Sequence, residues 1–162
     1  MPILKSQPIT PVPFGAWWLR SVNLLKVANG YNLNVAFVPY NGQYTLTTTP
    51  ARLSLDVDAK KAEDQTFSDA VDALMTEVQR QYSIRNGNPT INSFEIKILN
   101  VMAQNPDRFV SIFANILVNG EIKRLLINDV FGLAVADSTF ATVLDTVINE
   151  LGRQAKLAGK ID

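Results

Sequence analysis

The chain has 162 residues, of which 47% are hydrophobic, and its 15 basic and 15 acidic side chains cancel. This length and apolar content suit one globular domain with its own core. The chain contains no cysteine and no histidine. It therefore has no disulfide or thiolate chemistry, and it lacks the commonest general base and metal ligand. We accordingly expect no enzyme, no cofactor and no bound metal.

Hydrophobic runs in this chain are too short for a membrane protein. None approaches the roughly 20 apolar residues that cross a bilayer. The proline-rich residues 1–15 lack the apolar segment of a secretory signal. We expect them to form a flexible arm on a cytoplasmic protein of a bacterial or virus-infected cell, with no membrane partner and no small-molecule substrate.

Charge is unevenly distributed along the chain. Residues 1–55 carry four basic side chains and no acidic one, whereas residues 56–79 carry seven acidic and two basic ones. Residues 85–127 again have a basic excess, of five side chains against three. The sheet-forming segments are thus basic and the helical segment is acidic, and a ligand would meet one face rather than the average charge.

Four strands are predicted before the first helix. Alternating polar and apolar residues and two Asn-Gly turn sequences, at 29–30 and 41–42, indicate successive hairpins. The predicted strands are residues 16–27, 31–40, 43–49 and 52–57. An acidic loop over residues 58–65 then leads into a helix, for which Thr66 or Ser68 is the predicted N-cap.

The second half repeats this order. A turn-rich break at residues 86–89 separates the halves, and a third Asn-Gly pair lies at 119–120. The predicted strands are residues 94–102, 108–118, 121–127 and 130–136. Residues 106–118 could instead form a helix, because proline is favoured at a helix start. Asp137 or Ser138 is the predicted cap of the second helix, which runs to residue 157.

The two predicted helices share more than a period. Residues 67–81 and 140–154 place apolar side chains at the same six spacings, on one helical face. A shift of 73 residues also superposes four polar identities: Asp72 on Asp145, Glu77 on Glu150, Arg80 on Arg153 and Gln81 on Gln154. Because any two amphipathic helices share the apolar spacing, the polar matches are what predict an internal duplication.

An α+β fold follows from these elements. We expect two four-strand-plus-helix repeats, residues 16–83 and 90–157, within one pseudo-symmetric domain over residues 16–157, followed by a tail over 158–162. One such unit cannot bury both its helix and its sheet, so the expected architecture is two antiparallel sheets packed with two helices. One face of each sheet would stay open to a ligand.

The arrangement resembles the Whirly family of single-stranded DNA-binding proteins, which is related in fold to positive-cofactor type transcriptional coactivators. The residues that carry the resemblance are the strands 95–101 and 114–118 and the strand, turn and helix start 133–144. The resemblance implies two four-strand-plus-helix repeats, homo-oligomers packed through the helices into tetramers, and single-stranded DNA running over exposed sheet surfaces.

Sequence-tolerant binding of single-stranded nucleic acid needs cations for the phosphates and flat aromatic faces for the bases. We expect a role in replication, recombination or repair. Four phenylalanines, at 37, 94, 109 and 113, are assigned to the core. Lys123 and Arg124 would point to opposite sheet faces. The predicted nucleic-acid-binding residues are Trp18, Arg20, Lys26, Tyr31, Tyr44, Arg52, Lys97, Arg108 and Lys123.

Two other interpretations stay open. The missing histidine and cysteine and the zero net charge also suit a non-enzymatic structural or assembly protein, for example a phage virion component. Binding of a divalent cation is the second alternative, because four carboxylates lie in or next to the acidic loop. These are Asp56, Asp58, Glu63 and Asp64. No nucleophile paired with a base is recognisable.

Overall fold

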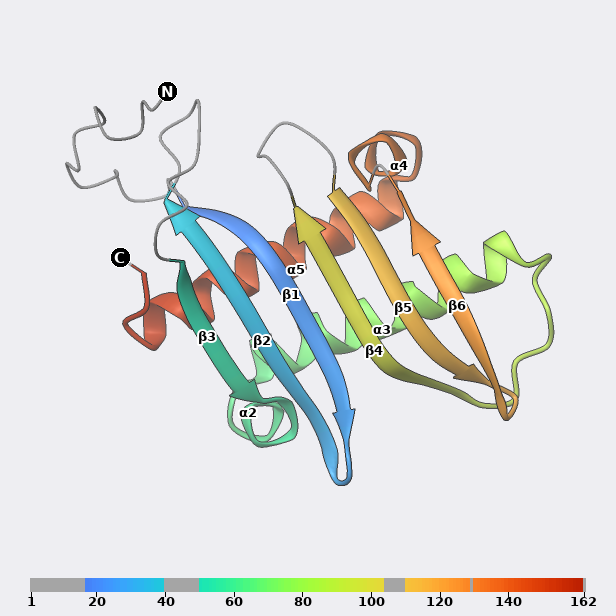
Figure 1. Ribbon diagram of the computed structural model, residues 1–162, viewed down its shortest axis with the longest axis horizontal. Helices are drawn as coiled ribbons and strands as arrows, with labels where there is room; N and C mark the ends of the chain where they lie inside the picture. Colours follow the sequence, from blue (N-terminus) through green and yellow to red (C-terminus); the bar gives the residue numbers. More distant parts are fainter. Residues whose placement is uncertain (1–16, 40–49, 104–109, 129, 162) are drawn as a thin grey trace.

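A computed structural model describes residues 17–39, 50–103, 110–128 and 130–161 of this protein. Over these residues the chain forms one six-stranded antiparallel sheet, in the order β3-β2-β1-β4-β5-β6, with two long helices across one face (Figure 1). The strands are β1 (Trp17–Val27), β2 (Gly30–Pro39), β3 (Ala51–Asp56), β4 (Phe94–Ala103), β5 (Val110–Val118) and β6 (Glu121–Ile127). The helices are α2 (Val57–Glu63), α3 (Gln65–Arg85), α4 (Val130–Ala136) and α5 (Ser138–Leu157). The predicted α+β class is confirmed.

The single sheet corrects the expectation of two sheets. Strands β1 and β4 pair edge to edge, from Ser21 opposite Met102 to Leu25 opposite Ile98. Because directly opposed residues share a face, the apolar rows of both halves join into one continuous surface. One such row holds Leu55, Leu33, Leu24, Leu99, Ala114 and Leu125. Both amphipathic helices then cover that one surface, and the halves do not need to face each other.

Two segments between strand and helix differ from their predictions. Residues 58–65 were expected to be a loop, but α2 begins at Val57, where the Asp56 side chain accepts a hydrogen bond from the Ala59 backbone N–H at 3.1 Å. Residues 130–136 were expected to be a strand and instead form α4. A seven-residue apolar run fits either structure, so periodicity does not decide between them. The predicted strand over residues 43–49 and the predicted arm lie outside the described residues.

Both long helices are present, and their caps follow one rule. An aspartate precedes each helix and accepts a hydrogen bond from the backbone N–H three residues on, Asp64 from Phe67 and Asp137 from Phe140, at 3.1 Å in each case. The prediction of Asp137 as a cap is confirmed. The prediction of Thr66 or Ser68 is wrong, because aspartate takes the cap position two to four residues earlier.

Each capping aspartate is also bound by the other helix. Asp64 accepts hydrogen bonds from Arg153 Nη2 at 2.7 and 2.8 Å and from Gln154 Nε2 at 2.9 Å. The buried Glu150 accepts from the same two side chains, at 2.7 to 2.8 Å. The buried Glu150 and Gln154 therefore both have hydrogen-bond partners, which offsets the penalty of burying them. We call this cluster the first latch.

The second latch is built from the matching residues in the opposite sense. Asp137 accepts from Arg80 Nη2 at 3.1 and 3.2 Å and from Gln81 Nε2 at 3.3 Å. Buried Glu77 accepts from Arg80 Nη1 at 2.6 Å and from Gln81 Nε2 at 2.8 Å. An arginine and a glutamine of each long helix thus bind the aspartate that caps the other helix. Three of the four polar identities shared by the helices are explained by these contacts.

The latches predict a loss of stability in acid. The hydrogen bond from Gln154, with that from the Phe67 backbone, lowers the pKa of Asp64 from 3.8 to about 2. The Phe140 N–H, followed by Arg80, likewise lowers the pKa of Asp137. A lowered folded-state pKa contributes stability above the unfolded value, and that stability is lost as the pH falls from about 4 to about 2.

Asp64→Asn keeps a capping oxygen and removes the charge. In denaturant titrations, we expect this variant to be less stable than the wild type at pH 7 and to lose less further stability between pH 4.5 and pH 2.5. Asp145→Asn, on the exposed side of α5, is the matched control. Equal pH dependence in all three proteins would contradict the role of the first latch.

Candidate binding face

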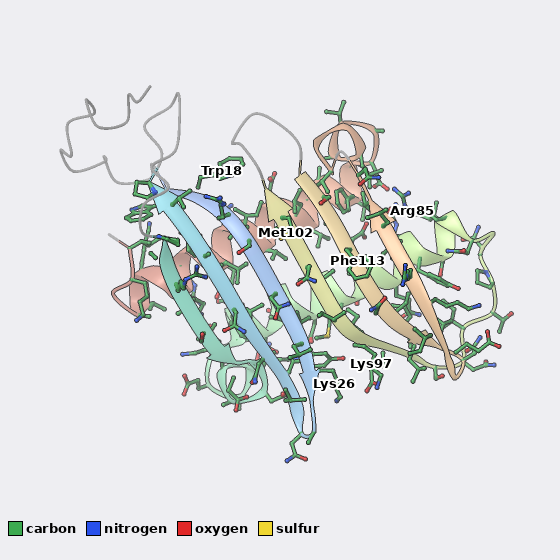
Figure 2. All side chains as sticks on the ribbon, in the orientation of Figure 1. Trp18, Lys26, Arg85, Lys97, Met102 and Phe113 are labelled. Atoms are coloured by element: carbon green, nitrogen blue, oxygen red, sulfur yellow. The ribbon has the colours of Figure 1, made fainter. Side chains whose placement is uncertain are left out.

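The sheet surface opposite α3 and α5 is the candidate site, and we call it the open face. Strand pairing places its side chains in rows that cross the sheet. One row holds Ser54, Asn34, Asn23, Asn100, Phe113 and Leu126, and the next holds Asp56, Asn32, Leu25, Ile98, Asn115 and Arg124. Figure 2 looks onto this face, with Met102 and Phe113 on β4 and β5.

The β3-β2-β1 side of the open face is polar. Asn23 Nδ2 donates a hydrogen bond to Asn100 Oδ1 at 2.5 Å, across the junction of the two halves. Ser54 Oγ donates to Asn34 Oδ1 at 2.6 Å. These four side chains, which we call the asparagine row, satisfy one another in pairs. Each pair therefore satisfies one amide oxygen without a ligand.

Most of the exposed apolar side chains of the open face lie on β4, β5 and β6. Leu126, Ile122 and Met102 are 54%, 61% and 57% exposed, while Phe113 is half-buried and pairs with Leu126. The prediction that Phe113 belongs to the core is therefore wrong, because the register turns it away from the helices. With Leu25, Ile98 and Leu117, these four residues define the apolar patch.

Three of the predicted nucleic-acid-binding residues gather around one carboxylate, Glu95. Lys97 Nζ lies 2.5 Å and Lys26 Nζ 3.6 Å from its oxygens. Lys26 Nζ also lies 5.0 Å from the centre of the Tyr31 ring, and the Tyr31 hydroxyl donates to the Ile96 carbonyl at 2.9 Å. The hydrogen bond from Lys97 lowers the pKa of Glu95, and burial, with the charge of Glu95, raises that of Tyr31. The carboxylate of Glu95 therefore offsets part of the positive charge of Lys26 and Lys97.

The remaining predicted residues are scattered. Lys123 Nζ pairs with Glu121 at 3.1 Å. Arg52 is exposed on the open face at the β3 edge. Trp18 and exposed Arg20 lie at the start of β1, beside an apolar cavity under the sheet. Tyr44 and Arg108 lie outside the described residues. The predicted set therefore does not form one continuous groove within the described part of the chain.

Arg124 is an open-face cation that the predicted nucleic-acid-binding residues do not include. It sits opposite Asn115 on the open face, while its neighbour Lys123 has the reverse direction. Alternation correctly predicted that only one of the two could serve this face, and the register identifies which. Among the described residues, neither Arg124 nor Arg52 forms an ion pair.

The four carboxylates suggested as metal ligands have structural partners instead. Asp56 and Asp64 cap helices, Asp58 Oδ2 accepts the Tyr31 N–H at 2.9 Å, and Glu63 pairs with Lys60 at 2.8 Å. In the described ranges, no three acidic side chains converge as a cation site would need. Within the same ranges, no helix combines the length and hydropathy required to cross a membrane.

No protein-family model, curated protein or solved structure gives a significant match to this chain. The resemblance to Whirly proteins therefore stays a prediction from short pieces of sequence. The described residues form an α+β protein with one antiparallel sheet, helices on one face and a mixed polar and apolar surface on the other.

Proposed function

We propose that this protein is a non-enzymatic assembly protein that binds a second copy of itself through the open face. The apolar patch carries this proposal, because it exposes several large apolar side chains on one regular surface, with Asn100, Asn115 and Arg124 between them. A concentration of exposed apolar side chains of this kind marks an interaction site. A phage virion component is one protein of this class.

The size of the open face suits a stable dimer. Six strands about 4.8 Å apart, each offering about eight residues at about 3.3 Å, give a surface of roughly 750 Å². Standard stable interfaces bury about 800 Å² on each partner. The whole face, rather than the apolar patch alone, is therefore the unit that a partner would cover.

Charge on the open face favours a second copy as the occupant. One row carries Asp56 at its β3 end and Arg124 at its β6 end. A two-fold axis parallel to the strands, between β1 and β4, would set each Asp56 opposite Arg124 of the other copy. Self-complementary placement of this kind is what an isologous interface requires.

Association through the helices, which the Whirly resemblance implies, is less favoured. The exposed side chains of α3 and α5 are largely acidic or hydroxyl-bearing, as with Asp69, Asp72, Thr142 and Asp145. The open face offers more apolar surface to a partner. Tetramers remain compatible with the proposal if a second, weaker contact joins two such dimers.

We also infer that the halves are copies of one unit. In each half, three described strands lead through a short helix to a long one, as β1-β2-β3-α2-α3 and β4-β5-β6-α4-α5. The two latches, which use the same residue types 73 positions apart, support this inference. The unit proposed here has three described strands where four were expected.

The assembly proposal predicts a dimer that one charge on the open face disrupts. Leu126→Asp should weaken self-association at least tenfold, because burying an unpaired carboxylate is strongly unfavourable. Its fold should persist, since the side chain is already exposed. Sedimentation velocity over a concentration series measures the effect.

The control is Val135→Asp on α4, which changes an apolar side chain that is 90% exposed and lies off the open face. It should associate like the wild type. A wild-type protein that stays monomeric at about 100 μM, or equal association of Leu126→Asp and wild type, would overturn the proposal.

Single-stranded DNA binding is the second candidate, and Arg52 and Arg124 favour it. These cations sit at opposite edges of the open face, with the asparagine row and the Phe113 ring between them. Amides can bond base edges, and a ring can stack on a base. Within the described ranges these are the two arginines that the register places on this face, so we expect weak binding.

An anisotropy titration with a labelled oligonucleotide tests this candidate. With two phosphate contacts, we expect the logarithm of affinity to fall with the logarithm of salt at a slope of about −1.4. Arg52→Ala with Arg124→Ala should abolish binding, whereas Arg85→Ala, an exposed cation at the end of α3 (Figure 2), should not. Absence of binding at low salt would exclude it.

A further inference from the structure

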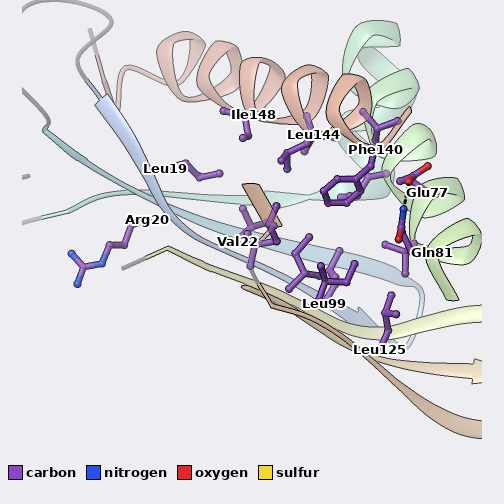
Figure 3. Close-up of a pocket in the computed structure, with 18 of the residues that line it drawn as sticks. Leu19, Arg20, Val22, Glu77, Gln81, Leu99, Leu125, Phe140, Leu144 and Ile148 are labelled. Atoms are coloured by element: carbon purple, nitrogen blue, oxygen red, sulfur yellow. Dashed lines mark hydrogen bonds between the residues drawn. The ribbon is translucent and has the colours of Figure 1, made fainter. Parts of the chain in front are cut away.

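An apolar cavity of about 350 Å³ lies between the sheet and the long helices (Figure 3). Sheet residues such as Val22, Leu99 and Leu125 form one wall, and Phe140, Leu144 and Ile148 of α5 form the other. Its volume is more than twice that of the roughly 150 Å³ apolar cavity that takes up benzene in another protein, and falls within the range of small-ligand sites.

The inner end of the cavity has no polar group in need of a partner. Glu77 and Gln81 line it, but they bond each other at 2.8 Å and are held by Arg80 and Asp137 in the second latch. A polar ligand group placed there would lose its hydration without replacement. The part of a ligand that enters must therefore be apolar.

The outer end of the cavity reaches the surface beside a cation. Arg20 lines the cavity and is exposed, and its guanidinium points outward in Figure 3. It occupies the bulge of β1, between Leu19 and Ser21, which releases it from the strand alternation. Among the described residues it has no acidic partner. A negative head group at this mouth would meet an uncompensated positive charge.

We propose that the cavity binds an aliphatic chain with an anionic head group, the chemistry of a fatty-acid carboxylate. The chain fills the space between Leu99 and Leu144, and the carboxylate stays at the mouth near Arg20. This site lies on the opposite side of the sheet from the open face. The proposal therefore does not depend on self-association, and it adds a small-molecule ligand where the sequence suggested none.

Tryptophan fluorescence can report binding in this cavity. The chain has two tryptophans, Trp17 and Trp18, and both line the cavity. Dodecanoate, titrated below its micelle-forming concentration, should change the intrinsic fluorescence saturably and raise the melting temperature, because a ligand that binds only the folded state stabilises it. Dodecan-1-ol should bind as well, but more weakly, since it lacks the charge.

Variants separate the cavity from other apolar surface. Leu144→Phe with Ile148→Phe fills the cavity and should weaken dodecanoate binding at least tenfold. Leu157→Phe, on the exposed end of α5, should leave it unchanged. Arg20→Gln should weaken dodecanoate severalfold and leave dodecan-1-ol unaffected.

Sedimentation with phosphatidylglycerol vesicles distinguishes the two sources of such a chain. Dodecanoate binding without vesicle retention assigns a free carboxylate, and retention that the filled variant abolishes assigns a membrane lipid. No saturable binding of dodecanoate, or equal binding to the wild type and the filled variant, would overturn the proposal.

Discussion

Both the packing of the helices and the open face follow from the pairing of β1 with β4. It joins two three-stranded halves in one plane, so their apolar rows form a single surface that α3 and α5 cover together. Because the helices then lie side by side, each capping aspartate comes within reach of the other helix, and the latches can form. Within the described part of the chain, no helix covers the opposite side of the sheet, where polar and apolar side chains lie next to each other.

Much of this fold could be predicted from the sequence, because periodicity reports local burial. The helical spacing of apolar residues located α3 and α5, and alternation with Asn-Gly turns located the described strands. The residues of the two latches are also related by the 73-residue offset, because Asp64 and Phe67 match Asp137 and Phe140. What periodicity could not decide was the short run at α4, or whether the halves meet edge to edge. The edge pairing is a long-range choice between Ser21 and Met102 that no local pattern encodes.

The sequence predicts that one sheet face is exposed, but it does not show which residues lie on that face. Alternation says that neighbours such as Lys123 and Arg124 diverge, yet only the register shows that Arg124 shares a row with Asn115. Bulges at Arg20 and Lys97 break the alternation at two predicted site residues. The sequence of this region is basic, but Glu95 pairs with both Lys26 and Lys97, so the surface is less positive than the sequence suggests. Ion pairing of this kind is visible only once the strands are aligned.

We propose that a second copy of the chain covers the open face. Oxidative footprinting of Met102 tests it most directly, because this thioether is 57% exposed in the isolated chain and lies within the apolar patch. Half-buried Met75 on α3 serves as the internal reference. If a second copy covers the apolar patch, Met102 oxidation should slow as protein concentration rises, while that of Met75 stays constant. A Met102 oxidation rate that is the same at every concentration would contradict it.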